Sequence, residues 1–301
     1  DMSQPRFALA PDGRMFMVSD GNFQDVPFRN SALAVLNPDL SDVFERPLIL
    51  HEDQFSENGF HMWPDVATNG TRLAAAWHRC PFINDQKEVV ECDIDLQLAN
   101  LEANGAITPV GQSVLVNQND PSGTINFRPS VAMAPGGQSV VVWIDSRTGE
   151  QFDVFGQRFD AAGNRLGSNF QVSDGTGAID VRAAGRPEVA MLDDGQFAVV
   201  WGDSAAAGLR AWQRSFAADA TPLTPPLQIA ATVNTGLPAI ASNGRSYATV
   251  YLTEQNGQLG IETGTPPSTV STEARPEEAR PSVKLHSYPQ PFRDRVTLQY
   301  E

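Results

Sequence analysis

Two acidic residues occupy equivalent positions in a short sequence motif that is repeated along this chain. Asp65 follows Pro64 and Glu188 follows Pro187, each where a short strand is expected to begin. The other copies of the motif carry different residues at this position, namely Arg6, Ser130 and Ala239. Two carboxylates can act as acid and base, or as acid and nucleophile, in the hydrolysis of a glycosidic bond. Asp65 and Glu188 are therefore the candidate catalytic residues.

The repeated motif consists of proline, a variable residue, a hydrophobic residue and alanine, which would form a first strand. A turn and a second strand follow it. Its clearest copy is RPSVAMAPGGQSVVVW, from Arg128 to Trp143, and it recurs with prolines at positions 5, 64, 129, 187 and 238. Short strands joined by glycine turns indicate β-hairpins. A period of roughly 50 residues built from such strands is typical of a β-propeller. In that fold Asp65 and Glu188 would lie near the axis.

Each repeat is long enough for four strands, except that the fifth repeat ends after its third strand, near Gly264. We therefore predict an all-β fold, a propeller of about five four-stranded blades over residues 1–265. A β-sandwich array is the alternative architecture. The valine-rich runs that end at Trp143 and Trp201 show little alternation of apolar and polar residues, which favours strands packed on both faces. The indole rings of these tryptophans would then be buried between blades.

Beyond residue 265 the composition changes. Residues 266–281 are rich in Pro, Glu, Ser and Thr, which predicts an extended linker. Residues 282–301 contain one alternating strand, Arg295 to Tyr300, and a single strand buries too little surface to fold alone. This segment is expected to be the opening of a further domain.

The segment SYPQPFRDRVTLQYE, from Ser287 to Glu301, resembles the start of the C-terminal sorting domain of bacterial type IX secretion cargo. That domain commonly opens with Tyr-Pro-Asn-Pro-Phe before a strand, and here Gln290 takes the place of Asn. The resemblance implies a truncated, β-sandwich-like sorting domain at 282–301. It also implies export through the type IX machinery, with the protein secreted or held at the outer surface of a Gram-negative bacterium.

The stretch from Trp143 to Gly167 is similar to repeats of large secreted bacterial proteins, which are predicted propeller blades mostly without an assigned activity. The matching residues are Trp143, Asp145, Arg147, Asp153, Gln157, Arg158 and Gly163. Asp145 and Arg147 are candidate ligand-binding residues at the end of a strand. The alternative is a structural contact that ties this loop to Asp153 or Arg158.

His61 and Trp63 are further candidate ligand-binding residues, because they lie together just before the second repeat, near one rim of the expected blade. The four histidines are dispersed without ligand spacing, so no metal site is predicted. Acidic turns at 117–123 and 173–180 offer oxygen ligands, so the sequence is compatible with bound calcium. No other cofactor is expected. Cys80 and Cys92, the two cysteines, flank a polar insertion, and a hairpin would bring them close enough for a disulfide.

The net charge is -15 and the isoelectric point is about 4.6. Phosphate binding needs clustered Lys and Arg, so a nucleic-acid partner is not expected. No apolar run is long enough for a transmembrane segment.

Three functions follow from this pattern. The leading expectation is a non-enzymatic scaffold at the cell surface, which binds a protein or glycan through the irregular rim loops 21–30, 54–63 and 80–92. The first alternative is a carbohydrate-active enzyme, a glycosidase or lyase, with carboxylates at the axis. The second is a structural subunit of an envelope assembly.

Overall fold

The computed structural model describes most of the chain before residue 265. The described residues are 3–21, 30–39, 41, 48–49, 59–81, 91–102, 106–118, 121, 123–149, 152–174, 179, 185–205, 208–233, 238–255 and 258–264. The chain divides into two units, Asp1–Pro266 and Pro267–Glu301, and all described residues belong to the first. The predicted linker and sorting domain therefore lie outside the described residues.

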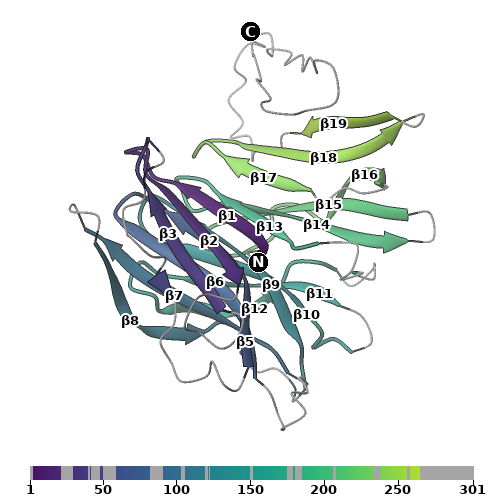
Figure 1. Cartoon of the computed structure of the whole chain (residues 1–301). Coiled ribbons are helices and arrows are strands. Elements are labelled where there is room, and N and C mark those ends of the chain that lie inside the picture. The colour runs from purple at the N-terminus through teal and green to yellow at the C-terminus, as the bar shows by residue number, and fades with distance from the viewer. Residues whose placement is uncertain are drawn as a thin grey trace. The chain divides into compact units, whose positions relative to one another are not determined.

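The described residues contain strands and no helix, so no helix among them could cross a membrane. Antiparallel pairing arranges the strands in five sheets that follow one another along the chain (Figure 1). The first sheet holds β1 (Ser3–Leu9), β2 (Met15–Gly21), β3 (Asn30–Leu36) and β4 (Leu48–Ile49). The second holds β5 (Gly59–Thr68), β6 (Arg72–Pro81), β7 (Asp93–Leu101) and β8 (Ile107–Leu115).

The remaining sheets repeat this order. The third holds β9 (Asn126–Met133), β10 (Ser139–Asp145), β11 (Asp153–Phe159) and β12 (Arg165–Gln171). The fourth holds β13 (Glu188–Met191), β14 (Phe197–Ala205), β15 (Gly208–Phe216) and β16 (Leu227–Val233). The fifth holds β17 (Ala239–Ser242), β18 (Tyr247–Gln255) and β19 (Gln258–Gly264).

This arrangement confirms the all-β propeller and corrects the number of blades. Four sheets are complete four-stranded blades, whereas the fifth sheet has three strands among the described residues. About five four-stranded blades were expected. The sequence predicts that the fifth copy ends after its third strand, near Gly264, and β19 is the last strand among the described residues.

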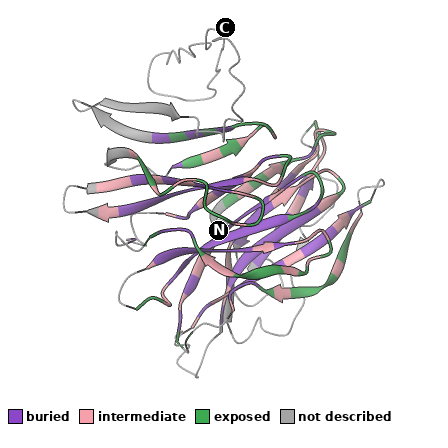
Figure 2. Ribbon diagram, turned by 180° about the vertical axis from the view of Figure 1, so that it is seen from behind, coloured by how far each residue is buried: buried purple, intermediate pink, exposed green. Residues whose placement is uncertain are grey.

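The hydrophobic core lies between the blades, because successive sheets bury apolar side chains against one another. Separate clusters of buried side chains join the first blade to the second, the second to the third, the third to the fourth and the fourth to the fifth sheet. Every residue of β10 is buried, whereas β8 and β12 are largely exposed (Figure 2). Trp77, Trp143 and Trp201 are buried between blades, as the sequence predicted.

Each repeat begins with a hairpin whose turn contains a glycine in the left-handed region. The residues are Gly13, Gly70, Gly137, Gly195 and Gly244, with φ between 86° and 91°. Such a φ is unfavourable for residues that carry a Cβ atom. Substituting these glycines would therefore strain the turns that connect the first and second strands of each sheet.

In the fourth and fifth sheets the strand begins directly after the proline of the repeat, as predicted, with β13 at Glu188 and β17 at Ala239. In the second and third blades the proline does not open the strand. β5 and β9 begin several residues earlier, at Gly59 and Asn126, and the strand register shifts around Pro64 and Pro129. Proline has no N–H to donate to the ladder, so a bulge accommodates it within a continuing strand. Residues 59–63, expected to be loop, belong to β5, and residues 59–62 pair with residues 78–81 of β6.

Cys80 and Cys92 form a disulfide, as predicted. The bond links the end of β6 to the residue that precedes β7. The irregular parts of the three predicted rim loops, residues 22–29, 54–58 and 82–90, lie outside the described residues.

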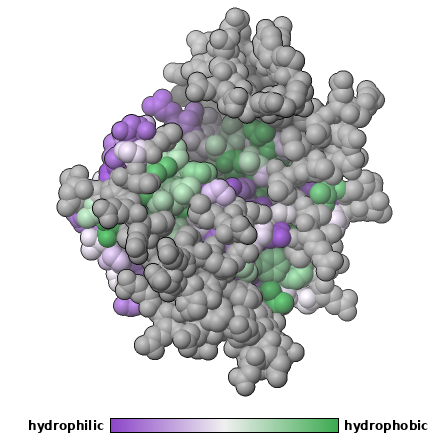
Figure 3. Space-filling model, viewed as in Figure 1, coloured by the Kyte–Doolittle hydropathy of each residue, from purple (hydrophilic) through white to green (hydrophobic). Residues whose placement is uncertain are grey.

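One face of the first blade stays uncovered by the described residues. Phe7 and Leu9 of β1 are 55% and 68% exposed, and no buried cluster of the described residues joins this face to the fifth sheet. Figure 3 shows apolar side chains on this side of the molecule, over the first blade. Among the described residues, no hydrophobic cluster therefore joins the first and last sheets.

Candidate active site at the propeller axis

The first strands of the blades bring charged residues together at the axis. β1, β5, β9 and β13 gather around the middle of the propeller (Figure 1). Arg6 of β1 donates from Nε to Asp65 Oδ1 of β5 at 3.0 Å, and from Nη2 to Glu188 Oε2 of β13. Three blades thus contribute to one ion-pair cluster, and the two candidate catalytic carboxylates meet on a single guanidinium.

Asp65 is held on both of its carboxylate oxygens. Oδ2 accepts a hydrogen bond from the backbone N–H of Val131 at 2.9 Å, and Arg186 Nη1 lies 3.6 Å from Oδ1. The side chain of Asp65 is only 6% exposed. These contacts fix the orientation of the carboxylate, and the two guanidinium groups compensate its negative charge in a buried position.

Glu188 has a different environment. Burial raises the pKa of its carboxyl group, the charge of Asp65 adds to this, and Arg6 and Arg186 oppose it. Burial alone would lower the pKa of Arg6, but Asp65 and Glu188 together raise it, and burial lowers the pKa of Arg186. A carboxyl group whose pKa is raised by burial can hold a proton for general acid catalysis, as Glu188 could here.

Trp63 and Arg128 lie beside this cluster, each directly before the proline of its repeat. Both have positive φ values, 54° and 56°. The guanidinium of Arg128 stacks on the Trp63 ring at 4.5 Å, and that of Arg186 lies 5.9 Å from the same ring. Non-glycine residues in this region are strained by about 1–3 kcal/mol, and such strain is common at functional sites.

His61 is buried at 1% exposure and lies opposite Arg79 in the strand register, while His78 lies opposite Met62. His78 Nδ1 accepts a hydrogen bond from the backbone N–H of Arg128 at 3.4 Å. His61 and His78 are therefore at neighbouring register positions, close to the bulge that carries Trp63. Trp63 is partly exposed and His61 is not, so of the two ligand-binding candidates only Trp63 is reached by solvent.

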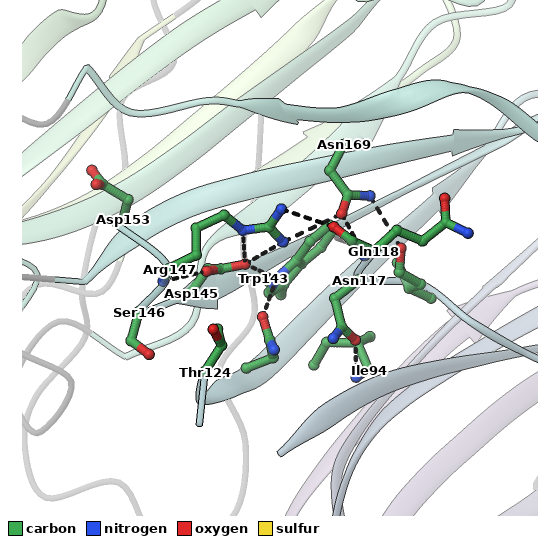
Figure 4. A network of polar contacts seen from close by, with 12 residues as sticks. Ile94, Asn117, Gln118, Thr124, Trp143, Asp145, Ser146, Arg147, Asp153 and Asn169 are labelled. Atoms are coloured by element: carbon green, nitrogen blue, oxygen red, sulfur yellow. Dashed lines mark hydrogen bonds and ion pairs between the residues drawn. The ribbon is translucent and has the colours of Figure 1, made fainter. Parts of the chain in front are cut away.

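Asp145 and Arg147 belong to a different network, within the third blade (Figure 4). Asp145 Oδ2 accepts hydrogen bonds from Trp143 Nε1 at 2.9 Å and from Arg147 Nη2 at 2.6 Å. Arg147 also contacts Gln118 and Asn169. Asp145 is fully buried.

The structural contact expected for this loop is present, but with another partner. Arg147 pairs with Asp145 rather than with Asp153, and Asp153 instead accepts from Thr148 and Ser173. The two-residue spacing lets the side chain of Arg147 fold back onto Asp145, which is closer to it in the sequence than either predicted partner. Arg79 with Asp95 and Arg210 with Asp203 make similar pairs in the second and fourth blades. These residues hold the blades together.

Sequence reasoning singled out the two carboxylates of the axis but missed the arginines that join them. Arg6 was noted only as a counterpart of Asp65, and Arg128 and Arg186 were not considered. Their positions in the repeat contain the signal, because Arg6 directly follows its proline and the other two directly precede theirs. Aligning the five copies on the proline would have placed all three at the axis.

The described residues include no group of three or more His, Cys, Asp or Glu side chains that could hold a metal ion.

Comparisons with known proteins bear on the fold. No known family and no curated protein matches the sequence. Among solved structures, an α-L-arabinofuranosidase of Fusarium graminearum in complex with arabinobiose superposes with a TM-score of 0.57, at 11% identity, over 87% of this chain and 80% of that chain. The endo-arabinase of Bacteroides thetaiotaomicron gives a TM-score of 0.51 at 15% identity, over 89% and 94%.

A Trypanosoma rangeli sialidase mutant with trans-sialidase activity gives a TM-score of 0.56 at 12% identity, over 88% of this chain and 46% of that chain. These similar structures are enzymes that act on glycans, and they contradict the expectation of a non-enzymatic binding scaffold. That expectation gave most weight to the rim loops and little to the two acidic positions of the repeat. At these identities the comparisons establish one property of this chain, its β-propeller fold.

Proposed function

We propose that this protein is a carbohydrate-active enzyme that hydrolyses glycosidic bonds at the propeller axis. The observation that carries the proposal is the meeting of Asp65 and Glu188, from different blades, on the guanidinium of Arg6. The arabinofuranosidase, endo-arabinase and sialidase that share the fold support a glycan as substrate.

The two carboxyl groups have separate roles in the proposed reaction. Glu188, whose pKa is raised by burial, donates its proton to the glycosidic oxygen as the bond from that oxygen to the anomeric carbon breaks. Asp65 stays ionised and faces the positive charge that develops on the sugar ring. Water adds its hydroxyl group to the anomeric carbon, and its other hydrogen restores the proton of Glu188. Arg6 is a positioning residue that holds both carboxyl groups.

The test is the release of reducing ends from a panel of glycans that includes arabinan and sialylated oligosaccharides. We expect Glu188→Gln to reduce the rate by about 10²–10⁴-fold, the usual contribution of a general acid. Asp65→Asn should reduce it by a similar factor. Glu102→Gln, at an exposed position of the second blade, is the matched control and should retain full activity. Full activity in both axis variants, or no release from any glycan by the wild type, would refute the proposal.

The proposed location is outside the cell. The Cys80–Cys92 disulfide supports an oxidising compartment, and residues 282–301 resemble a type IX sorting signal. Expression of the full-length protein in a type IX-competent host, with and without that segment, tests this part. Equal export of both forms would exclude the segment as the signal.

A further inference from the structure

Cationic side chains gather at the axis of a strongly acidic protein. The chain carries a net charge of -15, yet Arg6, Arg128 and Arg186 all lie in the cluster around Asp65 and Glu188. Asp20 also acts electrostatically on Arg186. Burial raises the pKa of Glu188, and when its carboxyl group is protonated the three guanidinium groups outnumber the other carboxyl groups of the cluster, those of Asp65 and Asp20. In that state the axis carries an excess of positive charge, in contrast to the chain as a whole.

Arg6 retains hydrogen-bonding capacity after it has joined the two carboxyl groups. Its contacts with the described residues use Nε and Nη2, and its side chain is 33% exposed. A guanidinium has five N–H groups in one plane, so the Nη1 end of Arg6 can donate to a third carboxylate. A bound molecule could supply such a carboxylate.

Trp63 and Arg128 add a surface suited to a sugar ring. The bulges before Pro64 and Pro129 place the indole and the guanidinium face to face at 4.5 Å. Arg128 donates from Nη1 to the carbonyl oxygen of Gly185 at 2.9 Å, which ties it to the segment that leads to Glu188. A ligand at the axis would therefore meet an aromatic ring and guanidinium groups together, beside the two carboxyl groups.

We infer that the site takes a glycan with a carboxylated sugar unit, a uronic acid, whose carboxylate binds the exposed end of Arg6 with support from Arg128. This inference rests on the proposed function for its reaction, but it concerns recognition and can be tested by binding alone. A neutral sugar would leave the excess guanidinium charge without a partner, whereas a carboxylate forms charge-assisted hydrogen bonds with it.

The test compares galacturonate with galactose, titrated into the Glu188→Gln variant and followed by NMR. We expect galacturonate to bind at least about tenfold more tightly, which corresponds to one charge-assisted hydrogen bond. Added salt should weaken this preference, because it depends on charge. Arg6→Gln should abolish the preference, and Arg245→Gln, at an exposed turn of the fifth sheet, should leave it unchanged.

Arg128→Gln provides a second variant, because it leaves the contacts of Arg6 with Asp65 and Glu188 in place; we expect it to reduce the preference severalfold. Equal affinity for the two sugars, or a preference that survives in both variants, would overturn the inference. Preferential binding of galacturonate without hydrolysis of any glycan would support the inference and refute the proposed hydrolysis. Hydrolysis of neutral glycans only would support the proposed reaction and refute acidic-sugar recognition.

Discussion

Two arginine–carboxylate networks in this propeller differ in how they are assembled. In the third blade Arg147 folds back onto Asp145, two residues away, and the pair closes on the indole of Trp143. At the axis Arg6 reaches Asp65 and Glu188, which lie 59 and 182 positions away and in two other blades. Asp145 is fully buried and the side chain of Arg147 is 14% exposed, whereas the side chain of Arg6 at the axis is 33% exposed.

Other arginine–carboxylate pairs also form within single blades, between Arg79 and Asp95 and between Arg210 and Asp203. The axial cluster instead brings together different residues from equivalent positions of three repeats. This difference supports a structural role for the pairs within blades and the proposed catalytic role for the axial cluster.

The largest expected stability effect concerns the local network. Asp145→Ala removes one of the two acceptors of Trp143 Nε1 and the partner of the partly buried Arg147, so we expect a loss of about 3–5 kcal/mol in the free energy of unfolding. Denaturant titration measures this value. Asp219→Ala, at an exposed turn, is the control and should leave the free energy of unfolding nearly unchanged. A loss from Asp145→Ala as small as the control would contradict the structural role.

A smaller loss of stability is expected when the aromatic ring at position 143 is kept and only its hydrogen bonds are removed. Trp143→Phe preserves an aromatic side chain between the blades but removes the Nε1 hydrogen bonds to Asn126 and Asp145, both at 2.9 Å. We expect a loss of about 1–2 kcal/mol by thermal or chemical unfolding. Should the loss equal that of Asp145→Ala, the ion pair would not be the main contribution of this network.

The smallest stability effect is expected at the axis and depends on pH. Because the pKa of Glu188 is raised in the folded state, its contribution to stability is present at low pH and is lost as the pH rises through that raised pKa. The stability of the wild type relative to Glu188→Gln should therefore fall with increasing pH. Unfolding curves of both proteins across the mildly acidic to alkaline range measure it, and parallel pH dependences would exclude a raised pKa.

Much of the fold could be predicted from the sequence, because the repeat itself contains the information. Proline, alanine, a glycine turn and a strand ending in tryptophan specify one hairpin, and five copies of that hairpin indicate a propeller. The strand starts were predicted less well. A proline normally limits a strand, and only the tertiary pairing of Gly59 and Phe60 with β6 shows that the strand continues through a bulge.

The site was predicted in part. Asp65 and Glu188 were found because two copies of the repeat carry acids where the others do not. Their joint contact with Arg6 could not be derived, since it depends on side-chain reach across the axis. The spacing of Asp145 and Arg147 suggested a ligand site as readily as an ion pair, and only the burial of Asp145 distinguishes the two.

By itself, the sequence determined the repeat, the sheet-forming pattern, the pair of cysteines and the acidic positions that depart from the repeat. Hydrophobic periodicity and turn residues act over a few positions along the chain, so the sequence alone is enough to recognise them. The tertiary structure decided that three blades place Arg6, Asp65 and Glu188 in one cluster, and that Glu188 holds its proton more tightly. Proton affinity depends on burial and on neighbouring charges, and both arise only when distant segments pack together.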